Sequence, residues 1–268
     1  MATARTALRS RYAACAVDCP MFPTEAIATL GEFFAVFHSL LAPRTDFWFR
    51  GHASLRFKLT PSALRFPDAA MRTKALLLIA DMRRYLEMKL PRPPGGDDVL
   101  GWTQVAQHYG LPTRLLDWTR NAAVALFFAC SSHHDQDGLV VVLNPVELNQ
   151  SVEPRDPRIF NLERDADTIR PYFALDGRLN PRGRRTIAID PAWNTERIAL
   201  QQGAFTLHGS RAFDLNRHQA SSLSYVPILK EHKLDLLHEL ERVGIGEMFI
   251  FPEPEHVCSH LRRTAGLL

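Results

Sequence analysis

Apolar residues recur at intervals of three and four along much of the chain, which is the pattern of helices that bury one face. The first such stretch opens at Thr24, which suits the N-cap position, and ends at Pro43. Residues 122–130 are apolar on every side and predict a buried helix, with Thr119 or Asn121 as its N-cap. Four further helices are predicted over residues 69–90, 99–109, 230–242 and 253–263.

Strands are indicated where short runs are rich in aromatic and β-branched side chains. These runs are residues 46–51, 113–118, 139–143, 197–207 and 248–251. The glycine in the middle of 197–207 suggests a bulge or a close backbone approach. Residues 145–195 hold six prolines and are expected to be irregular. The pattern therefore predicts an α+β fold, with a small, mostly antiparallel central sheet flanked by helices.

Composition narrows the class of protein. Of 268 residues, 46% are hydrophobic and 23% are charged, so the chain can bury a sizeable core. A net charge of +3 is only mildly basic and does not by itself indicate nucleic-acid binding. The four cysteines form no CxxC pair, and no window approaches the ~18 apolar residues of a membrane span. We expect a cytoplasmic protein with reduced thiols and no membrane partner.

Familiar site motifs are missing from the sequence. There is no GxGxxG, Walker or GxSxG pattern. Two histidine-rich stretches, at 133–135 and 256–260, lack a second half with metal-ligand spacing, so we predict no metal site. Arginines between 170 and 185 offer phosphate contacts, but a solvated loop is the favoured interpretation.

Three separated segments resemble the FRG domain, which is named for its (F/Y)RG motif. They are WFRGH at 48–52, QHYGLPTRLLDWT at 107–119, and RIALQQGAFT at 197–206. With a further likeness at 240–252, the resemblance spans about residues 45–255. It implies an N-terminal helical extension at 1–44, an FRG domain at 45–255, and a C-terminal helix or tail at 256–268. We expect the three segments to share one sheet or one cleft, with Arg50 and Gln201 on the same side of the molecule.

The order of motifs is also similar to the arginine class of ADP-ribosyltransferases, including a split sheet. That resemblance implies that Arg50 grips the phosphate and ribose of a dinucleotide, with Thr113 or Thr119 supporting the site. Where such an enzyme carries Glu-x-Glu, this chain reads Gln201-Gln202-Gly203. The missing acid predicts binding with little transfer, unless Asp117 or Glu196 takes its place.

The candidate site residues come from these segments. A guanidinium held at a strand end is a bidentate phosphate donor, but Arg50 can equally pair with Asp117 to join two strands. His108 suits a general base or a buried structural histidine, and His52 shares a face with Arg50 only if the strand continues past Gly51. The predicted catalytic residues are Arg50, His108, Asp117 and Gln201, and the predicted ligand-binding residues are Arg50, His52, Gln107, Tyr109, Thr113, Arg114, Thr119, Arg197 and Gln202.

Two function classes follow. The leading hypothesis is a nucleotide-handling domain that binds an NAD-like ligand or transfers ADP-ribose, with NAD as ligand or substrate and no other cofactor required. The alternative is a non-enzymatic sensing or interaction module in a bacterial conflict or defence system, with a protein or nucleic-acid partner. A pocket with convergent polar groups would favour the first hypothesis, and burial of the motif residues in packing would favour the second.

Overall fold

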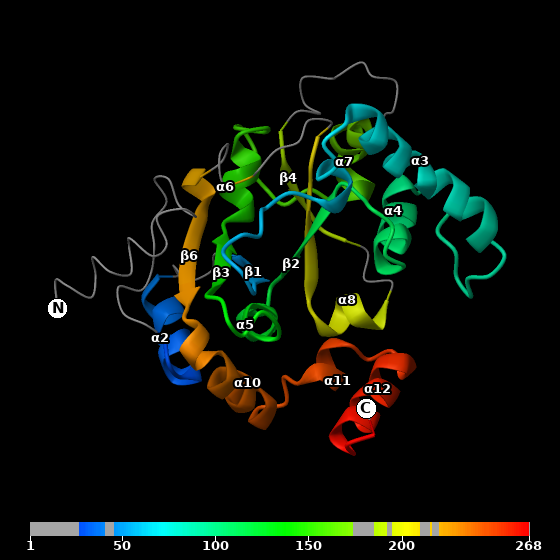
Figure 1. The fold of residues 1–268 in the computed structure, drawn as a ribbon. Helices are drawn as coiled ribbons and strands as arrows, with labels where there is room; N and C mark the ends of the chain where they lie inside the picture. Colours follow the sequence, from blue (N-terminus) through cyan, green and yellow to red (C-terminus); the bar gives the residue numbers. More distant parts are fainter. Residues whose placement is uncertain are drawn as a thin grey trace.

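The central sheet is antiparallel throughout. The computed structural model describes residues 27–40, 46–173, 185–191, 195–209, 215 and 220–267. Within these residues, six strands form one sheet in the order β4-β5-β2-β1-β3-β6 (Figure 1). They are β1 (Trp48–His52), β2 (Leu115–Thr119), β3 (Gly138–Leu143), β4 (Ile187–Ile189), β5 (Gly203–Leu207) and β6 (Leu223–Ile228). The predicted α+β class is confirmed.

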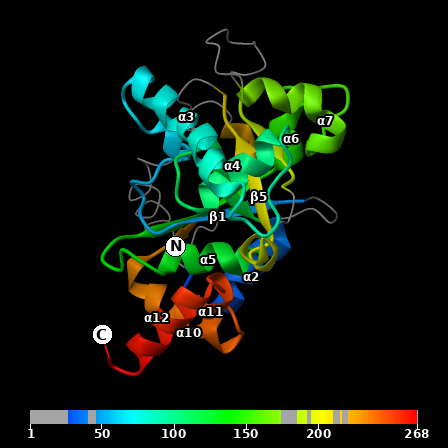
Figure 2. The ribbon, with the colours of Figure 1, turned by 90° about the vertical axis from the view of Figure 1, so that its right-hand side faces the viewer.

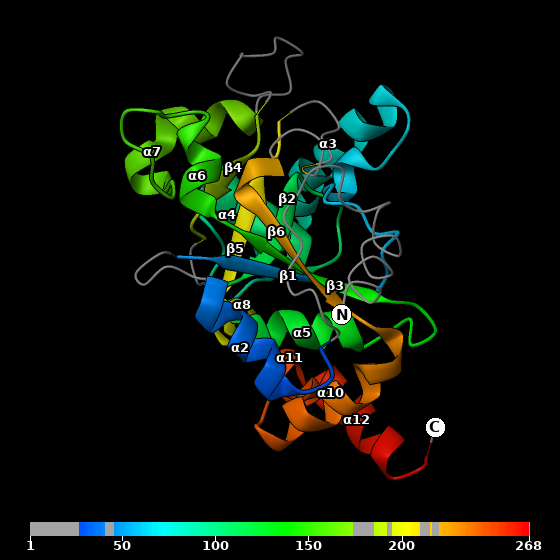
Figure 3. The ribbon, with the colours of Figure 1, turned by 90° about the vertical axis from the view of Figure 1, so that its left-hand side faces the viewer.

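Helices cover both faces of this sheet. Figures 2 and 3 show one layer below the sheet and one above it. The lower layer holds α2 (Leu30–Leu40), α5 (Ala122–Cys130), α10 (Lys233–Arg242), α11 (Glu247–Ile250) and α12 (Pro254–Thr264). The upper layer holds α3 (Ala69–Leu86), α4 (Val99–His108), α6 (Pro145–Gln150) and α7 (Leu162–Ile169). The short helix α8 (Glu196–Leu200) precedes β5, and no helix in the described part is long and apolar enough to cross a membrane.

Alternate side chains of the strands supply two cores, because successive residues of a strand point to opposite faces. In β3, Val140 and Val142 pack with α5 and α10. Leu139 and Val141 pack on the other face with Trp48 of β1. The sheet is therefore covered on both sides, and all six residues of β3 are buried.

Helix ends follow the predicted capping residues where these are described. Asn121 caps α5, since its side-chain oxygen accepts a hydrogen bond from the Ala123 amide at 3.0 Å. Gly110 follows α4 with φ of +80°, a conformation that favours glycine. Thr24, the predicted cap of the first helix, lies outside the described residues.

The interpretation of 197–207 as one strand is wrong. Residues 196–200 form α8, and β5 begins only at Gly203. Thr195 starts the helix by accepting a hydrogen bond from the Ile198 amide at 3.2 Å. Gln202, with φ of +47°, then turns the chain into the strand. A local cap and a left-handed turn thus override the strand-like pattern.

Two further assignments also fail. The predicted strand at 248–251 falls on the helical turn α11. The region 145–195, expected to be irregular, contains α6, α7 and β4. Asn144 and Asn161 cap the two helices, and proline at the first position of α6 is compatible with helix, so the prolines do not exclude regular structure.

Candidate functional site

The sheet opens between β1 and β2. These strands pair at one position, Phe49 with Thr119, whereas β1 pairs with β3 at five. Arg50, the next residue of β1, sends its guanidinium across the opening, and its Nη1 donates to the carbonyl oxygen of Asp117 at 2.5 Å. The same nitrogen lies 3.9 Å from a carboxylate oxygen of Asp117. A side chain thus makes the link that a backbone hydrogen bond would make in a regular sheet.

Gly51 allows β1 to lie directly against α5. A Cβ atom at this position would overlap the carbonyl oxygen of Ala125 and lie 2.6 Å from the amide nitrogen of Ala129. Both are backbone atoms of α5, so they cannot move aside without distorting the helix. The glycine of the Arg-Gly pair is therefore required by close approach of two backbones.

His52 continues the strand and faces the same way as Arg50. The Nε of Arg50 donates to Nε2 of His52 at 3.2 Å, which places the histidine proton on Nδ1. Burial, reinforced by the charge of Arg50, lowers the pKa of His52 to about 3. Burial also lowers the pKa of Arg50, and Asp117 opposes that shift. The arginine is thus fixed by a neutral histidine on one side and by β2 on the other.

A cavity of about 280 Å³, called here the strand cavity, lies at this opening. Residues of β1, β2, β5, α4, α5 and α8 line it, so the expected proximity of the three motif segments is confirmed. Arg50 and Gln201 both face it. The site residues predicted from the sequence that line the strand cavity are Arg50, Gln107, His108, Asp117, Thr119, Arg197 and Gln201.

On the α4 side, Gln107 connects two other motif residues. Its Nε2 donates to a carboxylate oxygen of Asp117 at 2.7 Å, and its Oε1 accepts from the Thr113 hydroxyl. Both ends of this amide are therefore occupied. His108 also lines the strand cavity, and its ring lies 5.0 Å from that of Tyr109 between centroids.

On the opposite side, the C-terminal segment holds Arg197 and Gln201 in place. The guanidinium of Arg197 lies 4.7 Å from the ring centroid of Phe251 and 3.5 Å from a carboxylate oxygen of Glu253. The side chain of Gln201 donates from Nε2 to the Ile250 carbonyl at 2.8 Å. The backbone carbonyl of Gln201 accepts a hydrogen bond from the Thr119 hydroxyl at 2.5 Å. Residues 250–253 thus hold two lining residues of the strand cavity in place.

Five predicted ligand-binding residues do not line the strand cavity. His52 and Thr113 are buried beside it, and Tyr109 and Gln202 are exposed outside it. Arg114 is buried on another side of β2, where its Nη1 donates to the Tyr172 carbonyl at 2.5 Å. Arg114 and Asp117, three positions apart in the chain, thus serve different neighbours, as alternation along a strand requires.

Comparison with protein families bears on the first two motif segments. Residues 45–138 match the family model described as the FRG domain. The chain contains an FRG domain. The match includes Arg50-Gly51 and the segment from Gln107 to Thr119, while the extension of the FRG domain to residue 255 stays a prediction. No curated protein and no solved structure matches the chain.

The sequence did not predict several residues that line the strand cavity. Gln104 of α4 lines the strand cavity. It lies three positions before Gln107 and four positions before His108 on the same helix. Helical periodicity was the signal that could have found it. Four aromatic side chains are also among the described lining residues: Phe49, Trp118, Phe128 and Phe205.

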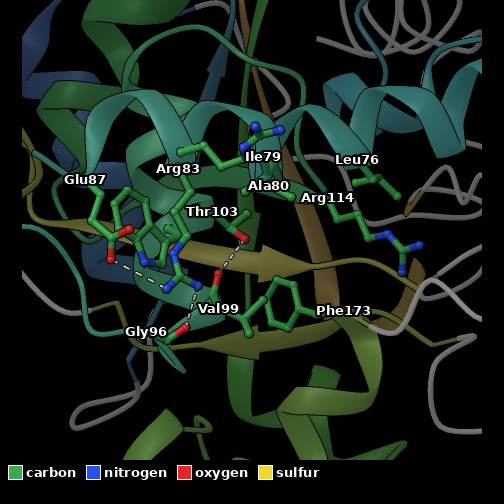
Figure 4. Close-up of a pocket in the computed structure, with 12 residues that line it drawn as sticks. Leu76, Ile79, Ala80, Arg83, Glu87, Gly96, Val99, Thr103, Arg114 and Phe173 are labelled. Carbon is green, nitrogen blue, oxygen red and sulfur yellow. Dashed lines mark hydrogen bonds and ion pairs between the residues drawn. The ribbon is translucent and has the colours of Figure 1, made fainter.

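A second cavity of about 510 Å³, the helix groove, lies between α3 and α4 (Figure 4). Leu76, Ile79, Val99, Trp102 and Phe173 contribute its apolar walls. Arg83 crosses it, donating from Nη1 to the Gly96 carbonyl at 2.7 Å and lying 3.6 Å from Glu87. The Thr103 hydroxyl donates to the Val99 carbonyl at 2.7 Å. Most polar groups of the helix groove are thus bonded within the protein.

Proposed function

We propose that the strand cavity binds a nucleotide-like ligand that carries phosphate, with NAD as the first candidate. The observation that carries this proposal is that Arg50 and Arg197 line one cavity together with aromatic side chains. Guanidinium groups bind phosphate oxygens through paired hydrogen bonds, and aromatic rings stack on bases. The match to the FRG domain supports the choice of this cavity, because Arg50 lies in the matched residues.

The size of the strand cavity limits how much of the ligand is enclosed. Pockets for small molecules usually measure about 300–1,000 Å³, and this one measures about 280 Å³. A whole dinucleotide does not fit into that volume. We therefore propose that one end of the ligand enters the cavity and that the remainder lies on the surface.

Binding without efficient transfer is the more specific proposal. Transfer of ADP-ribose passes through a cation-like ribose, which a nearby carboxylate stabilises. Gln201 provides no charge, and its amide already donates to the Ile250 carbonyl. Asp117 is the carboxylate that lines the strand cavity, and its side chain is 63% exposed. Any transfer would depend on Asp117, with His108 placed in the same cavity as a proton acceptor.

A second candidate function is a non-enzymatic sensing or interaction module in a bacterial defence system. The observation that favours it is the internal bonding of the motif residues. Arg50, Gln107 and Thr119 each bond to other parts of the chain. Residues that hydrogen-bond within the protein can stabilise a surface that recognises a partner, without binding a small molecule.

Calorimetric titration of the purified chain with NAD, ADP and ATP tests the proposal. We expect Arg50→Lys to weaken binding by about tenfold or more, because lysine keeps the charge and loses the paired donors. Arg83→Lys, in the helix groove, is the matched control and should leave affinity unchanged. Urea unfolding of both variants verifies that they are folded. Equal affinity of the Arg50→Lys variant and the parent chain for all three nucleotides would rule out Arg50 as the anchor.

A labelled-NAD assay with arginine acceptors addresses transfer. We expect little or no product from the parent chain. If product forms, it should disappear in Asp117→Asn. Robust transfer that persists in both Asp117→Asn and Glu196→Gln would place the chemistry outside these segments.

A further inference from the structure

Gln104 differs from the other amides of the strand cavity because its side chain is unused. It lines the cavity and is only 3% exposed. Neither its Nε2 nor its Oε1 has a hydrogen-bond partner within the described part of the chain. Buried polar atoms are nearly always paired in folded proteins, because removing them from water without a partner is costly. An unpaired donor and an unpaired acceptor on one buried side chain call for a partner that supplies both.

The neighbouring amides show that this is not a general feature of the helix or the cavity. Gln107 lies one turn further along α4 and has both ends bonded, to Asp117 and Thr113. Gln201 donates to the Ile250 carbonyl across the cavity. Gln107 and Gln201 thus bond to other parts of the chain, whereas Gln104 has no partner among the described residues.

We propose that Gln104 recognises a planar heteroaromatic group that carries an N–H donor and an acceptor side by side. A carboxamide presents its oxygen and its N–H groups in one plane, so a complementary edge makes two hydrogen bonds to it at once. The carboxamide of nicotinamide and the amino edge of adenine both have this chemistry. The inference deepens the proposed function, on which it rests, because it specifies that a ring with a donor–acceptor edge is the end of the nucleotide that enters the strand cavity.

The surroundings of Gln104 suit such a ring. The lining aromatic side chains come from β1, β2, β5 and α5, so apolar surface is present from four different elements. The two arginines, Arg50 and Arg197, line the same cavity and supply positive charge. A flat ring with a donor–acceptor edge, in a molecule that carries its phosphate away from the ring, matches this combination of apolar walls, two guanidinium groups and one amide without a partner among the described residues.

Binding of small ring compounds to the whole chain tests the role of Gln104. The probes are nicotinamide, adenine and nicotinate, titrated into the parent chain and the Gln104→Met variant with saturation-transfer NMR as the readout. Nicotinate keeps the ring and has no N–H donor beside its acceptors, so we expect it to bind about tenfold more weakly than nicotinamide. Gln104→Met keeps the size of the side chain and removes both polar atoms. It should weaken nicotinamide or adenine binding by about tenfold or more.

Stability of the ligand-free chain separates recognition from a structural role. Because Gln104→Met removes two unpaired buried atoms, we expect its unfolding midpoint to equal or exceed that of the parent chain. A structural amide would instead lower the midpoint. Thr103→Val, the adjacent residue on the helix-groove side of α4, is the matched control and should leave probe binding unchanged.

The outcomes distinguish this inference from the proposed function. If NAD and ADP bind the parent chain and Gln104→Met equally well, Gln104 does not recognise the ring, and the proposed binding of phosphate is unaffected. If Gln104→Met weakens the binding of nicotinamide but not of adenine, or the reverse, the affected compound identifies the end of the nucleotide that enters the strand cavity. If none of the ring compounds or nucleotides binds the parent chain, both proposals are overturned.

Discussion

Helix α4 separates two cavities that differ in how their polar groups are used. Its residues Val99, Trp102 and Thr103 face the larger helix groove, and Gln104, Gln107 and His108 face the smaller strand cavity. In the helix groove, the Trp102 indole donates to the Gly95 carbonyl at 3.1 Å, and Arg83 lies 5.5 Å from the Trp102 ring centroid. Arg114 also lines the helix groove, and its Nε lacks a partner among the described residues, but its Nη1 donates to the Tyr172 carbonyl. In the strand cavity, neither polar atom of the Gln104 side chain has a partner among those residues. This fully unpaired amide, rather than cavity volume, directs attention to the strand cavity.

The largest expected difference between the two cavities concerns their glycines. Gly51→Ala should destabilise the protein by about 3 kcal/mol, because the new methyl group meets the backbone of α5. Gly96→Ala, at the rim of the helix groove, should cost less than about 1 kcal/mol. There the nearest atom is the flexible end of Arg83, at 3.3 Å. Urea unfolding measures both, and similar losses would show that β1 can move away from α5.

The arginines of the two cavities provide the next comparison, since each lies over an aromatic ring beside a glutamate. Arg197→Met should destabilise by about 2 kcal/mol, because it leaves the carboxylate of Glu253 without its cation. The Glu253 side chain is only 18% exposed. Arg83→Met should cost less than about 1 kcal/mol, since its partner Glu87 is 50% exposed. Thermal or urea unfolding gives both values, and a larger loss for Arg83→Met would reverse the comparison.

Compared over one pH unit, the pH dependence of stability is the smallest of the three effects, and it comes from His52 beside the strand cavity. His52 has a folded pKa of about 3, and an unfolded histidine has one of about 6.5. Between these values the unfolded chain binds the proton and the folded chain does not. Stability should therefore fall as the pH falls through this window, by about 1.4 kcal/mol per pH unit for each such histidine.

His52→Gln tests this, because glutamine still offers an oxygen to Arg50 and does not titrate. Urea unfolding at pH 6 and pH 5 should show a slope smaller by about 1.4 kcal/mol per pH unit than that of the parent chain. The Arg83→Met variant should keep the parent slope. An unchanged slope in His52→Gln would mean that the pKa of His52 is the same in the folded and the unfolded chain.

His208, which directly follows β5, is a second fully buried histidine of the same kind. The Trp118 indole donates to the Thr206 hydroxyl at 3.0 Å, and that oxygen lies 3.0 Å from Nε2 of His208. Burial, reinforced by Arg50, lowers the pKa of His208 to about 3. The remaining slope in His52→Gln is therefore expected from His208, in the same direction of pH.

Local patterns were sufficient for much of this protein. Helical periodicity predicted α3, α4 and α10, because burial of one face leaves a regular pattern in the chain. The run of apolar residues at 122–130 predicted α5 as a helix buried on all sides. The motif around Arg50-Gly51 identified the FRG domain and the three segments that meet at the strand cavity. The strand-like pattern before Gly203 gave a wrong prediction. The Thr195 cap and the left-handed turn at Gln202 outweigh the weak strand propensity of these residues.

Only the tertiary structure decided which side chains remain available. Gln104, Gln107 and Gln201 are the same residue type in the sequence. Gln107 bonds to Asp117 and Thr113, and Gln201 bonds to the Ile250 carbonyl. Gln104 has no partner in the part of the chain that the structure describes. Likewise, the need for glycine at position 51 arises from α5, which is formed by residues about seventy positions later. Hydrogen bonds and close contacts between distant segments depend on how the elements pack, and no local pattern of the chain records them.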